Sequence, residues 1–129
     1  MTSGHIDFDL ENLADPNAAA PAGQYTLKIT NAEDKNSQKG LRMFVLEAQI
    51  VGDEDHAGKT IFEYWGLEGD GYWAKNGRFQ VAQLAKAIGL GSGDAFSDMI
   101  GAEFEAEVTL EPPTEEFNRE SNKIGRIYV

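Results

Sequence analysis

The feature that most constrains the fold is the spacing of the apolar side chains, which changes twice along the chain. Strand-like alternation with a period of two predicts β-strands at five places: 24–32 (QYTLKITNA), 41–51 (LRMFVLEAQIV), 59–66 (KTIFEYWG), 103–111 (EFEAEVTLE) and 122–129 (NKIGRIYV). Between the third and fourth strands, apolar residues recur at helical spacing, which predicts a helix over 78–89. Asn76 is its candidate cap and Gly89 its candidate stop.

Alternation also predicts which side chains form the core. In the third strand we place Glu63 in solvent, because carboxylates are rarely buried. This choice puts Ile61 and Trp65 outside with it, and Phe62 and Tyr64 inside. On the fourth strand the same rule places Glu103, Glu105 and Glu107 outward. The other predicted core residues are Tyr25, Leu27, Ile29, Phe44, Leu46, Ala48, Ile50, Phe79, Val81, Leu84, Ala85, Ile88, Phe104, Ala106, Val108 and Leu110.

Three strands, a helix and two strands follow one another in the order of a five-stranded OB-fold barrel, with the helix between strands three and four. We therefore predict a mainly β fold of this kind over residues 23–129, with a small mixed α+β sheet as the alternative. Residues 1–22 carry Asp7, Asp9, Glu11 and Asp15 and no Lys or Arg. They are predicted to form an acidic, flexible N-terminal tail.

Composition narrows the function. The 129 residues suit one domain, and the absence of cysteine excludes disulfides, a thiolate nucleophile and Cys-ligated zinc. No apolar run is long enough to span a bilayer and no signal peptide is visible, so the expected location is the cytoplasm, with no membrane partner. The net charge of −11 argues against general binding to duplex DNA or anionic lipid. A local basic path remains compatible with it, because salt screens distant charges.

Motifs for catalysis are weak. Asp53, Asp55 and Gly58 match part of a calcium loop, but Tyr64 stands where that loop needs a bidentate carboxylate. The GLGSGD segment (89–94) follows a helix and lacks the spacing of a phosphate-binding loop. With no convincing nucleophile, base or metal set, we predict a protein that is not an enzyme and has no metal or cofactor.

Aromatic and basic residues, in contrast, gather along residues 61–79 and in the loops that an OB fold uses to grip single strands. Bases stack on aromatic rings whatever the sequence, so a few rings and cations suffice for single-stranded DNA. Tyr64 and Trp65 fit either core or surface, whereas Tyr72 and Trp73 favour contact. The candidate contact residues are Lys35, Lys39, Arg42, Lys59, Tyr64, Trp65, Tyr72, Trp73, Lys75, Arg78, Arg119, Lys123, Arg126 and Tyr128.

Several segments resemble phage-encoded OB-fold single-stranded DNA-binding proteins. They are PAGQYTLKITNAE (21–33), RMFVLEAQIVG (42–52), AGKTIFEYWGL (57–67), GAEFEAEV (101–108) and NKIGRIYV (122–129). The resemblance covers residues 21–129 and implies a non-sequence-specific binder of single-stranded DNA that acts in phage DNA replication or recombination, in the cytoplasm of the infected host cell.

Two points stay open. Many single-strand binders end in an acidic segment, whereas this chain carries its acidic segment first. Residues 1–22 are therefore hypothesised to recruit replication or recombination proteins, or to compete for the DNA groove. The alternative function is an acidic phage accessory protein that binds a protein partner, for example as a DNA mimic. The sequence leaves a homo-oligomer open.

Overall fold

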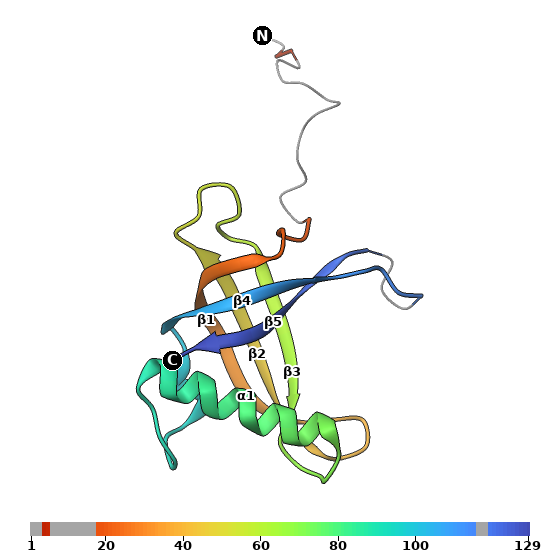
Figure 1. Cartoon of the computed structure of the whole chain (residues 1–129), viewed down its shortest axis with the longest axis vertical. Coiled ribbons are helices and arrows are strands. Elements are labelled where there is room, and N and C mark those ends of the chain that lie inside the picture. Colours follow the sequence, from red (N-terminus) through yellow and green to blue (C-terminus); the bar gives the residue numbers. More distant parts are fainter. Residues whose placement is uncertain (1–3, 6–17, 116–118) are drawn as a thin grey trace.

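The computed structural model describes residues 4–5, 18–115 and 119–129, so most of the predicted acidic tail lies outside the described residues. The element order is the predicted one of three strands, a helix and two strands (Figure 1). A 3₁₀ turn precedes the fourth strand. The elements are β1 (Gly23–Asn36), β2 (Arg42–Val51), β3 (Thr60–Gly66), α1 (Tyr72–Ile88), η1 (Phe96–Met99), β4 (Glu103–Glu111) and β5 (Ser121–Tyr128).

The five strands form one antiparallel sheet in the order β3-β2-β1-β4-β5. Its centre is the long strand β1, which pairs with β4 through residues 23–28 and with β2 through residues 26–36. The β1–β2 register shifts between Ile29 and Asn31, and the Thr30 hydroxyl donates to the Glu47 carbonyl at 3.0 Å there. Such a bulge bends a strand, so β1 can serve two differently oriented partners.

The two edges of the sheet, β3 and β5, approach each other without a backbone ladder in the described part of the chain. Side chains satisfy the edge groups instead. The Glu63 carboxylate of β3 accepts the Ile124 N–H of β5 at 3.3 Å. Gln80 of α1 donates to the Gly125 carbonyl of β5 at 2.8 Å. The structure thus shows a five-stranded sheet whose edges are bridged by side chains; a closed barrel is not observed.

Helix α1 lies across the end of β3 (Figure 1). The approach is close because both contact residues are glycines. A Cβ atom on Gly77 would overlap the backbone of Gly66, and one on Gly66 would overlap the indole of Trp73. The helix ends at Gly89, whose left-handed φ of 81° is the predicted stop. In the described residues, no helix is long and apolar enough to cross a membrane.

Much of the predicted core is confirmed. Phe44, Leu46, Ala48 and Ile50 of β2 are fully buried, as are the inward side chains of β4 up to Val108. Beyond Val108, where β4 still pairs with β5 but no longer with β1, Leu110 is exposed, contrary to the prediction.

Two helix predictions are wrong. The helix begins at Tyr72, six residues before the predicted start, with Gly71 as its N-cap, so Asn76 lies inside it and caps nothing. Tyr72 and Trp73 are therefore helical and do not lie in a loop. Phe79, predicted as core, is 60% exposed because α1 packs through Gly77, Gln80 and Leu84.

Strand β1 is also longer than predicted and runs to Asn36.

Gly77→Ala tests the close crossing of α1 over β3. In a helix interior, alanine is normally more favourable than glycine by about 1 kcal/mol. Here the added methyl group must displace the β3 backbone, so we expect a net loss of about 1–3 kcal/mol in the free energy of unfolding. Urea denaturation measures it. The control is Gly91→Ala, where a Cβ meets nothing within 4 Å. Equal or greater stability of Gly77→Ala would contradict the crossing.

Candidate nucleic-acid interface

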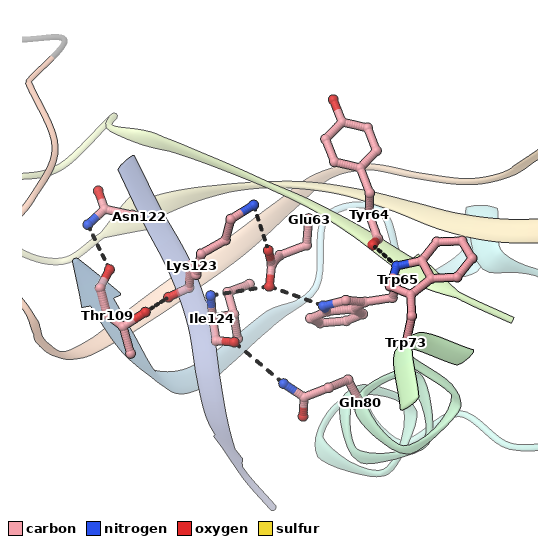
Figure 2. A network of polar contacts seen from close by, with 9 residues as sticks. All are labelled: Glu63, Tyr64, Trp65, Trp73, Gln80, Thr109, Asn122, Lys123 and Ile124. Carbon is pink, nitrogen blue, oxygen red and sulfur yellow. Dashed lines mark hydrogen bonds and ion pairs between the residues drawn. The ribbon is translucent and has the colours of Figure 1, made fainter. Parts of the chain in front are cut away.

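The register of β3 is opposite to the sequence prediction. Ile61, Glu63 and Trp65 are buried, whereas Phe62 is 47% and Tyr64 50% exposed. Trp65, at 5% exposure, stacks on Phe44 with ring centroids 6.0 Å apart. Figure 2 shows Tyr64 pointing away from the side on which Glu63 and Trp65 lie. Burial of Ile61 and Trp65 outweighed solvation of the Glu63 carboxylate. Trp65 therefore belongs to the core and is not exposed for contact with a ligand.

Glu63 is tolerated inside because donors surround its carboxylate (Figure 2). Oε2 accepts the Trp65 indole N–H at 3.0 Å and the Ile124 N–H at 3.3 Å, and Oε1 lies 3.4 Å from Lys123 Nζ. Burial nevertheless raises the pKa of Glu63 above its ordinary value of 4.5, and Lys123 and the two hydrogen bonds only partly oppose this. Lys123 thus links the buried carboxylate to the surface.

A groove of about 810 Å³ runs between β3 and the hairpin formed by β4 and β5. The exposed residues of β3 and the start of β5 form its walls, and the chain before β1 forms its rim. Its lining residues include Ala18, Ala19, Lys59, Thr60, Phe62, Tyr64, Glu111, Pro112, Thr114, Arg119, Glu120, Asn122 and Lys123. Of the predicted contact residues, the structure brings Lys59, Tyr64, Arg119 and Lys123 together here.

The groove combines rings with charged side chains of both signs. Within the described residues its lining holds the cations Lys59, Arg119 and Lys123 and the acids Glu111 and Glu120, and Lys123 also pairs with the buried Glu63. Lys59 Nζ donates to the Ala18 carbonyl at 2.6 Å, a contact that orients the ammonium without neutralising it. Phe62 and Tyr64 alternate with buried residues, so both project from the same face of β3. This arrangement suits a flat, anionic ligand.

Phe62 is the residue that sequence reasoning missed, because it was assigned to the core. The signal that could have found it is the alternation of side chains along a strand: Phe62 and Tyr64 must share one face, and Ile61 and Trp65 the other. Choosing between the faces required knowing that Lys123 and Ile124, about sixty residues later in the sequence, supply partners to Glu63.

Other predicted contact residues lie elsewhere, near α1. Tyr72, Trp73, Lys75 and Arg78 belong to the first two turns of the helix. Trp73 donates its indole N–H to the Tyr64 carbonyl at 3.2 Å, and Arg78 donates to the Leu67 and Gly69 carbonyls at 3.0 and 3.1 Å. None of the four lines the groove.

The remaining cations are spread further along the strands. Arg42 pairs with Asp34 at 2.7 Å, which raises the pKa of the guanidinium, and Lys35 pairs with Glu33 at 3.2 Å. Lys39 lies in the β1–β2 turn, and Arg126 sits 5.7 Å from the Tyr128 ring on β5. The structure does not bring these five residues to the groove, and their part in binding stays a prediction.

The loop at residues 53–58 (DEDHAG), which was compared with a calcium loop, forms a turn. Asp53 Oδ1 accepts the N–H groups of Asp55 and His56, each at 3.0 Å, so this carboxylate stabilises the loop itself. Within the described ranges, no three His, Asp or Glu side chains are grouped so that they could hold a metal ion.

Fold and site together define a small, mainly β protein with a ring-lined groove beside an open sheet edge. The sequence model of a family described as proteins of unknown function, DUF669, matches residues 6–123. The chain belongs to this family. No curated protein matches the chain.

The raised pKa of Glu63 predicts a pH effect. Between 4.5 and the raised value, the folded protein keeps a proton that the unfolded chain has lost, so its free energy of unfolding falls as pH rises. Glu63→Gln keeps an acceptor for Trp65 and removes this titration. We expect the variant to gain stability relative to the wild type as pH rises from 4.5, measured by urea denaturation across that range. Glu105→Gln, an exposed site, controls for net charge. Parallel curves for Glu63→Gln and wild type would contradict the burial cost.

Proposed function

We propose that this protein is an OB-type, non-sequence-specific single-stranded DNA-binding protein, and that the strand lies in the groove between β3 and the β4–β5 hairpin. The observation that carries the proposal is the outward pair Phe62 and Tyr64, flanked by Lys59 and Lys123. The element order, and the contact of β1 with both β2 and β4, also support an OB-type architecture. The resemblance of the sequence to phage-encoded binders supports a role in phage DNA replication or recombination.

The physical logic depends on stacking. An aromatic ring contributes about 1–3 kcal/mol per stacked base and does not depend on base identity. The acidic surface elsewhere on the protein weakens this term little, because stacking is not a charge interaction. Duplex DNA, whose bases are already stacked on one another, would meet only the acidic surface and a few cations. Selectivity for single strands would follow.

Replacing the rings tests the proposal. Phe62→Ala and Tyr64→Ala should each weaken binding of a fluorescent dT oligonucleotide by about 1–3 kcal/mol, read by anisotropy, because each removes one stacking surface. Ile100→Ala is the control, since this apolar side chain is similarly exposed but lies outside the groove. Circular dichroism confirms folding of each variant. Unchanged affinity in both groove variants, with a loss in Tyr72→Ala, would move the DNA path to α1.

The salt dependence tests the cations separately. Each phosphate contact to a single strand contributes about 0.7 to the slope of log K against log salt. Lys59→Gln and Arg119→Gln should each lower the slope by about that amount, measured by titration at several salt concentrations. Lys123 is not substituted in this test, because removing its ammonium would leave the buried Glu63 carboxylate without its ion-pair partner. Lys28→Gln, outside the groove, is the control; an equal slope change there would indicate a general charge effect.

A second candidate, an acidic accessory protein that mimics DNA, is favoured by one surface. Glu103, Glu105 and Glu107 are exposed along one face of β4 and form a row of carboxylates. Under this reading, neutralising the row would abolish partner binding, and the groove variants would have no effect. Absence of single-stranded DNA binding by the wild type at low salt would favour it.

A further inference from the structure

The outer face of α1 carries an exposed stripe of rings and cations. Tyr72 is 82% and Phe79 60% exposed, and Lys75 and Lys86 lie on the same side of the helix at i+3 and i+14 from Tyr72. Neither lysine is in an ion pair within the described residues. We call these four residues the α1 stripe. Isolated exposed rings are ordinary, but two in line with unpaired cations form a patch.

An apolar cavity of about 430 Å³ adjoins the stripe. Val81 and Ala85 of α1, with Phe96 and Met99 of the η1 turn, form its walls. The charged residues Arg78, Lys86 and Asp94 line it as well, and the Asp94 carboxylate accepts the Gly91 N–H at 2.8 Å. Arg78 is fixed by its bonds to two backbone carbonyls, which leave its charge uncompensated. A cavity of this kind accommodates an apolar side chain while the cations meet carboxylates beside it.

The charge of α1 differs from that of the chain. The helix contains Lys75, Arg78 and Lys86 and no acid, whereas the chain has twice as many acids as cations. An occupant that suits the stripe and cavity therefore combines carboxylates with large apolar residues. The chain itself contains such a segment at residues 6–15 (IDFDLENLAD), where acids alternate with Ile6, Phe8, Leu10 and Leu13.

The same copy cannot supply this whole segment. Ala18 is bound by Lys59, and Ala20 exchanges two hydrogen bonds with Asn122, at the end of β3 remote from α1 (Figure 1). The seven residues of β3 span about 23 Å at 3.3 Å per residue. Leu13 precedes Ala18 by five positions and reaches at most about 18 Å from it. Leu13 and Asp15 therefore fall short of the helix.

We propose that residues 6–15 of a second copy of this chain dock on the α1 stripe, with an apolar side chain in the adjoining cavity and their acids against Lys75, Arg78 and Lys86. The surface that binds differs from the segment that is bound, so the contact is heterologous and joins copies head to tail. This contact does not involve the groove and stands whether or not the groove binds DNA.

Paramagnetic broadening in the full-length chain tests the contact. Because the chain has no cysteine, Asn12→Cys accepts a single spin label. Spin-labelled ¹⁴N protein is mixed with unlabelled ¹⁵N protein, so only contacts between copies are recorded. We expect broadening of the amides of residues 75–86 at low salt. It should disappear at about 1 M salt, where screening acts within about 3 Å.

Variants of the receiving copy sharpen the test. Phe79→Ser should weaken self-association, measured by sedimentation, by about tenfold or more, since a central aromatic anchor is removed. Lys75→Gln should lower the salt dependence of association, and Lys28→Gln, the same change outside the stripe, should not. No broadening between copies, or broadening confined to the groove, overturns the proposal. Broadening of the stripe by a spin-labelled dT oligonucleotide would assign it to DNA and overturn it equally.

Discussion

The carboxylate of Glu63 is the group on which the arrangement of both sheet edges depends. It lies between β3 and β5, which no backbone ladder joins, and accepts an N–H from each side. A carboxylate in this position costs desolvation energy, which its raised pKa records. The fold tolerates this cost only while Trp65, Ile124 and Lys123 keep their contacts with the carboxylate. The position of β5 and the register of β3 are therefore coupled through one side chain.

The groove follows from this coupling. With Glu63 inward, its neighbours in the sequence must project outward, because side chains alternate along a strand. Phe62 and Tyr64 consequently face the space beside the β4–β5 hairpin, and Lys123 reaches inward to Glu63 from the same wall. The opposite register would bury both rings and leave Trp65 in solvent. A polar contact in the interior thus decides which aromatic residues the surface presents.

The sequence predicted the fold in outline because most strands follow the rule that apolar faces turn inward. Strand β2 and the buried part of β4 obeyed it, and glycine marked the end of α1 correctly. The rule failed at β3, where Glu63 is buried by partners that are distant in sequence. The start of α1 was also mispredicted, because its N-cap Gly71 has no capping side chain that a local sequence pattern could reveal. Of the predicted contact residues, only those beside the β4–β5 hairpin meet in one groove, because Tyr72 and Trp73 belong to α1 and do not line it.

Segregation of charge explains how a chain of net charge −11 can present two surfaces suited to anions. Acids occupy the outer row of β4, several loops and the first residues of the chain, whereas α1 has none. At physiological salt, screening over about 8 Å separates these regions electrostatically. The groove and the α1 stripe also lie toward opposite ends of β3, so occupation of one leaves the other accessible. If both proposals hold, a row of copies joined through α1 would keep its grooves open, and each added copy would extend the surface available to a single strand.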